Sequence, residues 1–211
     1  MHIAHVIHTY YPRVGGIERA VQCLAEEQVK LGHEVTVITS DVNVTGHPKD
    51  EVVNGVNVVR LRSRKMLYND LMIPLEEPPI KSADIIHAHS QNSLFCLKVA
   101  QYAKVLSKPV VYQFIAVDYT KGDPRFAIRL FGHLYQEWVQ RKAARLASMV
   151  TTLNYRDHEL VKRKYSIESR IIPHGMDEKY LNKPIDEELF RKKFSIENDD
   201  IILYIGRLDP L

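Results

Sequence analysis

The sequence predicts an α/β fold with a doubly wound, mainly parallel sheet, and three observations indicate this class. Short apolar segments of strand length recur along the chain, at 2–8, 34–39, 84–88, 109–117, 148–153 and 170–172. Apolar residues at helical spacing fill several of the intervals, at 17–31, after residue 88 to about 106, and at 155–165. Loop signals separate the two kinds of segment, as at 12–16. Strands that alternate with helices are typical of a parallel sheet covered by helices.

The first helix and the first hairpin have clear local signals. Apolar spacing predicts a helix over 17–31, and Gly32 follows it, where a glycine commonly ends a helix. Asn54-Gly55, with valine on either side, predicts a type I′ turn because both residues tolerate positive φ.

The second half of the chain predicts a long helix and then a change of domain. The helix is expected to pack its aromatic side chains into the core: Phe126, Phe131, Tyr135 and Trp138. A charged stretch at 177–200 precedes one more apolar strand at 201–205. A strand needs neighbours, so we expect 1–176 to form one domain. Residues 177–211 are then expected to be an interdomain linker and the first strand of a truncated second domain.

Composition fits a folded globular protein. Hydrophobic residues make up 45% of the 211 residues and charged residues 26%, which excludes a disordered or collagen-like chain. No apolar run reaches the roughly 18 residues of a spanning helix, and the N-terminus has no signal-peptide pattern. Cys23 and Cys96 give neither a disulfide framework nor a zinc set, so a reducing, cytoplasmic location is expected.

The positive charge is concentrated in one segment. Residues 121–170 hold 11 lysines and arginines against 5 acidic residues, although the net charge of the chain is only +3. Such a segment suits an anionic partner such as phosphate, nucleic acid or a membrane surface, and a solvated helical face explains it equally well. Because no known DNA- or RNA-binding motif is present, we expect no nucleic-acid partner.

Gly15 and Gly16 stand between the first strand and the first helix. A helix N-terminus offers free N–H groups and partial positive charge, and glycines let a phosphate approach the backbone. A tight turn explains the pair equally well. The chain contains neither G-x-G-x-x-G nor a P-loop, which argues against a dinucleotide or P-loop site.

Two further motifs lie at the carboxyl ends of predicted strands, where open α/β sheets bind ligands. Alternation points His87 and His89 to the same face, and we expect one of them to face a cleft. The pair alone supplies too few ligands for a metal. Arg207, after Gly206, is well placed to contact a diphosphate.

Taken in order, these motifs resemble the N-terminal half of the retaining GT-B glycosyltransferases of family four. The matching segments run along nearly the whole chain: YPRVGGIE at 11–18, GHEVTV at 32–37, HAHS at 87–90, IPHGMD at 172–177 and YIGRLDP at 204–210. The resemblance implies two Rossmann-like domains that face a cleft. It also implies metal-independent transfer from a nucleotide sugar, with retention of configuration and no further cofactor.

The resemblance also implies roles for individual residues. The backbone of Gly15 and Gly16 would contact the donor diphosphate, and Arg207 would neutralise it as it leaves. The acceptor side would be lined by the side chains of Glu18, His89, Ser90 and Gln91.

Two departures from the family pattern bear on activity. Ile115 stands where family members usually carry a histidine that helps to position the sugar, and Asp118 or His89 would have to substitute as the catalytic residue. The family's later lysine and carboxylate motif are absent. One domain cannot enclose a nucleotide sugar or exclude water from it, so we expect the chain to be inactive without a separate donor domain.

A peripheral membrane contact is a further expectation. Basic side chains precede apolar ones in one segment, a pattern that suits an anionic lipid interface or a surface loop folded on the protein. The segment consists of Arg60, Arg62, Arg64, Lys65, Met66, Leu67, Tyr68, Leu71 and Met72.

Three functions therefore remain open. The leading one is the acceptor-binding half of a retaining glycosyltransferase, acting on a sugar or lipid-linked acceptor. The alternatives are a non-catalytic subunit that needs a separate donor domain, and part of a GT-B sugar-nucleotide epimerase or glycogen-type synthase.

Overall fold

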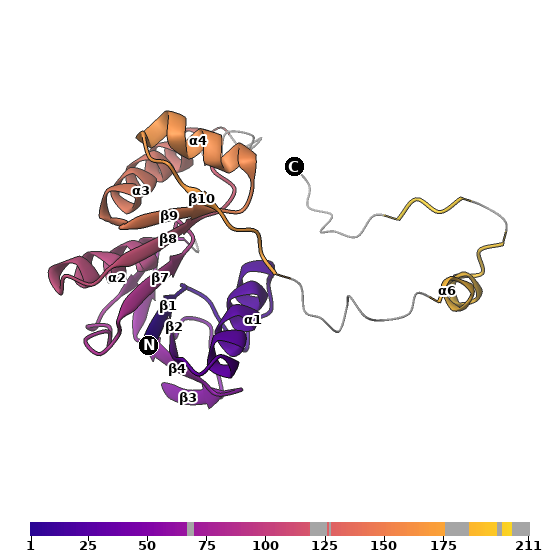
Figure 1. Cartoon of the computed structure of the whole chain (residues 1–211), viewed down its shortest axis with the longest axis horizontal. Helices are drawn as coiled ribbons and strands as arrows, with labels where there is room; N and C mark the ends of the chain where they lie inside the picture. Colours follow the sequence, from indigo (N-terminus) through magenta and orange to yellow (C-terminus); the bar gives the residue numbers. More distant parts are fainter. Residues whose placement is uncertain (67–69, 119–125, 127, 176–185, 198–199, 204–211) are drawn as a thin grey trace. The chain divides into compact units, whose positions relative to one another are not determined.

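The computed structural model shows an α/β architecture (Figure 1). It describes residues 1–66, 70–118, 126, 128–175, 186–197 and 200–203. The chain divides into two units, Met1–Gly175 and Met176–Leu211. The first unit carries the eight-stranded sheet and both hydrophobic clusters of the described residues, and the second contributes one described helix, α6 (Glu187–Phe194).

An eight-stranded sheet forms the centre of the first unit, in the order β10-β9-β8-β7-β1-β2-β4-β3. All neighbours are parallel except β3 and β4. The strands are β1 (His2–Val6), β2 (Glu34–Ser40), β3 (Asp50–Val53), β4 (Val56–Leu61), β7 (Ile85–His89), β8 (Val110–Phe114), β9 (Met149–Thr152) and β10 (Arg170–Ile171). A separate antiparallel pair consists of β5 (Ser63–Lys65) and β6 (Met72–Pro74). The strand order reverses its direction of growth at β1, which makes the sheet doubly wound and confirms the predicted fold class.

Helices cover the two faces of the sheet unequally (Figure 1). α1 (Gly16–Lys30) packs on one face with a small cluster that includes Val21, Ala25, Val37 and Val58. On the other face a larger cluster gathers residues of α2 (Leu94–Val105), α3 (His133–Leu146) and α4 (Tyr155–Tyr165). A π-helical turn at Ile128–Gly132 leads into α3.

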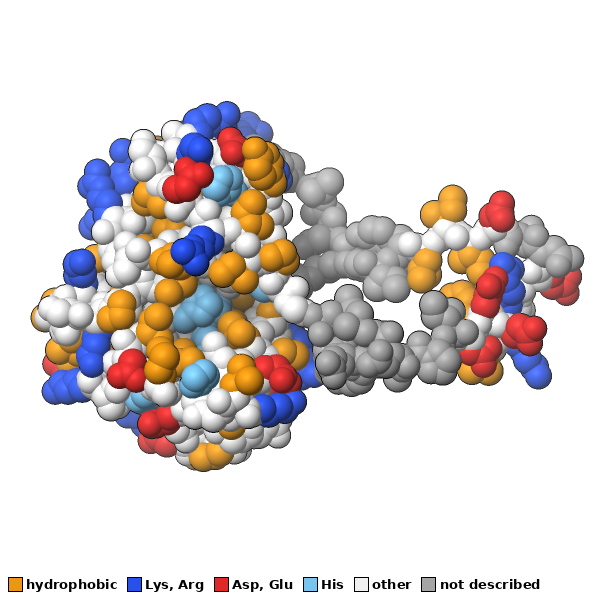
Figure 2. Space-filling model, in the orientation of Figure 1, with side chains coloured by type: hydrophobic (Ala, Val, Ile, Leu, Met, Phe, Trp, Pro, Cys, Tyr) orange, Lys and Arg blue, Asp and Glu red, His pale blue; other side chains and the backbone are white. Residues whose placement is uncertain are grey.

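Part of the α1 face stays open. His5, His87, Val111 and Met149 are register partners across β1, β7, β8 and β9, so their side chains share this face. His5 is buried beneath α1, whereas Met149, at the far end of the row, is 37% exposed. Figure 2 shows histidine side chains among hydrophobic ones on the side of the first unit turned to the viewer.

Local signals account for the ends of several elements. Gly32 adopts φ +84° directly after α1, and Asn54 and Gly55 both have positive φ between β3 and β4, which confirms the predicted cap and hairpin. The side chains of Ser93 and Asn154 accept hydrogen bonds from backbone N–H groups at the starts of α2 and α4.

Two predictions about the second half differ from the structure. Phe126, Phe131 and Trp138 are exposed rather than packed in the core, because small and polar residues of α3, such as Ala143 and Gln140, face the sheet instead. Residues 201–203 form no strand, and 204–205 lie outside the described residues. No helix in the described part of the chain has both the length and the apolarity needed to cross a membrane.

Candidate functional site

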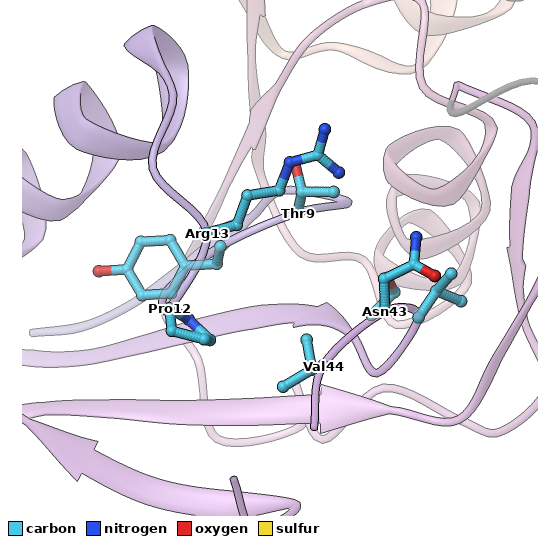
Figure 3. A pocket seen from close by; sticks show the side chains of 8 residues that line it. Thr9, Pro12, Arg13, Asn43 and Val44 are labelled. Atoms are coloured by element: carbon cyan, nitrogen blue, oxygen red, sulfur yellow. The ribbon is translucent and has the colours of Figure 1, made fainter. Parts of the chain in front are cut away.

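A pocket of about 340 Å³ opens where β1 and β2 end (Figure 3). One side comes from the loop after β1 and the other from the end of β2 and the loop that follows it. The lining residues are Thr9, Tyr10, Pro12, Arg13, Ser40, Val42, Asn43 and Val44. Open α/β sheets bind their ligands at this edge, so the position agrees with a binding role.

Buried hydrogen bonds hold the two loops in place. The Ser40 hydroxyl donates to the backbone oxygen of His8 at 2.8 Å. The Arg60 side chain, only 2% exposed, pairs with Glu51 and donates to the backbone oxygen of Tyr11 at 2.8 Å. A buried guanidinium needs several partners, and Tyr11 is one of them. Arg60 therefore fixes the loop after β1 to β4.

The pocket lining combines hydroxyl, amide and guanidinium groups. Arg13 and Asn43 enter from opposite loops (Figure 3). Among the residues that the structure describes, no carboxylate forms an ion pair with Arg13. Such a lining suits a polar ligand that carries hydroxyl groups and a negative charge.

The glycine pair behaves differently at its two positions. A Cβ on Gly15 would lie 2.2 Å from Oε2 of Glu18, whereas a Cβ on Gly16 would meet nothing within 4 Å. The Glu18 carboxylate folds back over the start of α1, and Thr9 Oγ1 donates to its Oε1 at 2.6 Å. Gly15 is therefore needed for the Glu18 side chain, and Gly16 leaves open space beside the helix N-terminus.

The position of Glu18 changes how the helix N-terminus can bind an anion. An N-terminal carboxylate is stabilised by the helix dipole in the same way as a bound phosphate. Glu18 would therefore compete with any anion at Gly15, and a diphosphate bound there would have to displace this carboxylate.

His89 and Gln91, which were expected on the acceptor side, are both buried. His89 is 1% exposed, and its two ring nitrogens lie 2.9 Å from His5 Nδ1 and 2.8 Å from Gln113 Oε1. Gln91 is buried, and its amide both donates to and accepts from the backbone of Ile115, at 2.7 and 2.8 Å. Both side chains are committed to internal hydrogen bonds, and His87, which is half-buried, is the histidine nearer to solvent.

The loop after β8 contains the remaining predicted residue, Asp118. Asp157 accepts hydrogen bonds from the backbone N–H groups of Ala116 and Val117. The Asp118 carboxylate forms an ion pair with Lys164, which also pairs with Glu137. Asp118 therefore helps to bind α4 and α3 to this loop, and the structure gives no direct support for a catalytic role.

Two predicted residues remain, Ser90 and Arg207, and only Ser90 lies within the described residues. Ser90 is half-buried and adopts φ +80° at the end of β7. Arg207 lies outside the described residues. The pocket residues Arg13, Ser40 and Asn43 were not predicted as site residues. Arg13 lies within the YPRVGGIE segment, whereas the loop after β2 carries no motif that could have indicated Asn43.

Comparison with known proteins gives consistent results. The model of Glycosyltransferase Family 4 matches residues 14–180. An uncharacterized glycosyltransferase of Methanocaldococcus jannaschii is 29% identical, with 99% of this chain and 56% of the relative covered. The alpha-monoglucosyldiacylglycerol synthase of Acholeplasma laidlawii is 25% identical, with 96% of this chain and 54% of the relative covered. The chain thus spans about half the length of these relatives.

A solved structure supports the fold. Sucrose-phosphate synthase from Thermosynechococcus elongatus superposes with a TM-score of 0.69 at 17% identity, over 99% of this chain and 56% of that chain. At this identity the likeness concerns the GT-B architecture alone.

Proposed function

The chain belongs to glycosyltransferase family 4, and we propose that it is the acceptor-binding half of an enzyme that transfers a sugar from a nucleotide-sugar donor to an acceptor with retention of configuration. The pocket between the β1 and β2 loops carries this proposal, because it adjoins the glycine-containing start of α1. An acceptor in the pocket and a diphosphate at the helix N-terminus would be neighbours, as transfer between them requires.

Arg13 narrows the class of acceptor. Its guanidinium enters the pocket with the hydroxyl of Thr9 and the amide of Asn43. These groups suit an acceptor that carries both hydroxyl groups and a phosphate or other anion. A neutral acceptor would leave Arg13 without a partner in the pocket.

The donor would be held mainly by a second domain outside this chain. The relatives, which this chain covers by 56% and 54%, have room for such a domain. Gly15 and Gly16 would supply backbone N–H groups to the diphosphate once Glu18 has turned away, and Arg207 would neutralise the leaving diphosphate. Glu18, once released, would face the acceptor side together with Ser90.

The remaining predicted residues would position parts of the fold and would not contact the substrates directly. His89 and Gln91 position the ends of β7 and β8 through their hydrogen bonds, and Asp118 holds the following loop through Lys164. The transfer needs no cofactor beyond the nucleotide sugar in this proposal, and no nucleic acid takes part.

Titration of the pocket tests the proposal. We expect the purified 211-residue chain to bind at least one anionic acceptor from a panel of sugar phosphates, inositol phosphates and glycolipid headgroups in calorimetry. Arg13→Met should weaken that binding at least about tenfold, since a charge-assisted contact contributes about 1.5–3 kcal/mol. Arg19→Met, on the exposed side of α1, is the matched control. Sugar transfer by the chain alone, or binding that Arg13→Met leaves unchanged, would contradict the proposal.

A membrane-bound acceptor is favoured by the surface of α3 and of the π-helical turn before it. Phe131 is 68% exposed and Trp138 is 47% exposed, and Lys142 Nζ lies 4.3 Å from the centroid of the Trp138 ring. Exposed aromatic rings beside cationic side chains suit an anionic lipid interface. The segment at 60–72 contributes less than predicted, because Arg60 and Met72 are buried and Leu67 and Tyr68 lie outside the described residues.

Vesicle flotation distinguishes this surface from a solvated one. We expect the chain to float with vesicles that contain anionic lipid and to remain in solution with neutral ones. Replacing Phe131 and Trp138 by serine should abolish flotation, whereas replacing the exposed Val105 of α2 by serine should not. Equal behaviour with both kinds of vesicle would exclude a peripheral membrane contact at this surface.

A further inference from the structure

Three histidines from two adjacent strands meet on the α1 face of the sheet. His5 of β1 is the register partner of His87 of β7, and His89 follows two residues later on the same face. The ring centroids of His87 and His89 are 4.1 Å apart, and that of His5 lies 5.3 and 5.1 Å from them. One ring nitrogen from each histidine lies within 4.8 Å of the other two. We call this cluster the histidine triad.

Two glutamines fix the outer nitrogens of the histidine triad. His5 Nε2–H donates to Gln28 Oε1 of α1 at 2.6 Å, and His89 Nδ1–H donates to Gln113 Oε1 of β8 at 2.8 Å. A neutral imidazole carries one proton, so His5 Nδ1 and His89 Nε2 are then both acceptors. These two nitrogens face each other at 2.9 Å. With the glutamine orientations of the structure, a positive species must lie between them.

A proton is a poor candidate for that species. Both rings are fully buried, and their side-chain hydrogen-bond partners within the described part of the chain are histidine and glutamine, so a second proton on the pair would leave a buried charge without an acidic partner. The third member has a nitrogen that a cation could take as a ligand. Nε2 of His87 is buried and has no hydrogen-bond partner among the described residues.

We propose that His5, His87 and His89 bind a zinc ion. Neutral imidazole is a preferred zinc ligand, and histidines that bind zinc usually donate their other N–H to an oxygen acceptor. Gln28 and Gln113 are such acceptors for His5 and His89. Three histidines leave one coordination position, which a water molecule can take on the side of the half-buried His87.

The geometry needs only modest adjustment. Zn–N bonds of about 2.0–2.1 Å place two nitrogens of a tetrahedral site about 3.3 Å apart. The facing nitrogens of His5 and His89 must therefore open by a few tenths of an ångström from 2.9 Å. Because Nε2 of His87 has no hydrogen-bond partner within the described part, turning this ring towards them would break no hydrogen bond at that atom.

A second cluster, Asp118, His133 and Glu137, has similar spacing but a different charge balance. The Lys164 ammonium group pairs with both of its carboxylates. A cation already occupies that position, so the histidine triad is the better metal site.

The zinc ion would have a structural role. It would connect β1 and β7, the two strands at the centre of the sheet, and through Gln28 and Gln113 it would orient α1 and β8. The proposal does not depend on sugar transfer, which would use no metal, and failure of either proposal leaves the other intact.

Metal titration of the full chain tests the proposal. The chain, prepared without a polyhistidine tag and freed of metal with EDTA, is titrated with Co²⁺ and then with Zn²⁺. We expect one tetrahedral cobalt per chain, seen by its intense visible absorption, and its displacement by one zinc. At a free zinc concentration 100 times the dissociation constant, the Tm should rise by about 5–10 °C.

Two variants assign the site. His87→Gln removes a ligand without removing a hydrogen bond at Nε2, so it should fold and should bind zinc at least about 100-fold more weakly, with no rise in Tm. His33→Gln, outside the histidine triad, is the matched control and should bind zinc like the parent chain. No bound metal, an octahedral cobalt spectrum, or equal binding by the His87→Gln variant would overturn the proposal. The first result would mean that a glutamine amide is turned over and the four side chains form a neutral chain of hydrogen bonds.

Discussion

At the residue scale, the glycine pair shows that one motif can serve two purposes. Gly15 makes room for the Glu18 carboxylate, and Gly16 leaves space at the helix N-terminus. The resemblance to the family implies phosphate contacts for both, and a tight turn explains the pair equally well, because glycine permits either. The side chain three residues later supplies a different reason for the first of them.

Substitution at Gly15 should reveal its link to Glu18. Gly15→Ala should push the Glu18 carboxylate away from Thr9, and the lost hydrogen bond should lower the free energy of unfolding by about 1 kcal/mol. Gly16→Ala, with open space around it, is the control and should cost little. Urea unfolding measures both. When Glu18 is already replaced by alanine, Gly15→Ala should hardly change the free energy of unfolding. A loss as large as in the parent chain would disprove the role of Gly15 in making room for Glu18.

Gln91 should be important for stability rather than for binding. Gln91→Leu leaves the backbone N–H and C=O of Ile115 without their partners, which should lower the free energy of unfolding by about 3 kcal/mol. Gln101→Leu, a half-buried glutamine of α2, is the matched control and should have a much smaller effect. A small loss for Gln91→Leu together with a large loss of acceptor binding would restore its predicted place on the acceptor side.

At the scale of elements, the pocket depends on how β4 holds the loop after β1. Arg60 joins Glu51 of β3, the backbone of Pro48 and the backbone of Tyr11. This arginine was predicted to lie in a basic surface segment. Charge patterning alone could not distinguish it from Arg62, because only the packing of β4 buries one of the two.

Arg60→Met should therefore affect both stability and the pocket. Removal of the buried guanidinium leaves the backbone oxygens of Tyr11 and Pro48 without their donor and Glu51 with only His47 beside it among the described residues, so we expect the free energy of unfolding to fall by about 3 kcal/mol. Arg62→Met, at an exposed position, should change it by less than about 0.5 kcal/mol. Denaturant unfolding of the two variants measures the difference, and similar values would contradict the role given to Arg60.

For α3, the spacing of apolar residues in the sequence does not determine which side of the helix faces the sheet. Aromatic residues along this helix were predicted to pack in the core. Tyr135 does pack against it, but Phe131, in the turn before α3, and Trp138 are exposed, and Val139 and Ala143 are buried instead. The periodicity predicts a helix correctly, yet it cannot say which side meets the sheet when both sides carry apolar residues.

At the scale of the whole molecule, the first unit holds every residue of both hydrophobic clusters. The described helix of the second unit, α6, has no buried residue. Deletion of 176–211 should therefore change the Tm by less than about 2 °C, because α6, the helix described there, buries no residue. Calorimetry of the 1–175 chain measures this, and a large fall in Tm would show that the second unit stabilises the first.

The sequence by itself determined the fold class, the positions of most elements and membership of glycosyltransferase family 4, because strand and helix periodicity, turn residues and ordered motifs are all local properties of the chain. Only the tertiary structure decided which side chains meet. It placed Asn43 opposite Arg13, committed Gln91 to Ile115, and brought His5 from β1 to His87 and His89 of β7. These contacts join residues far apart in the sequence, because the strand order and the packing of the loops bring them together, and neither leaves a local signal in the chain.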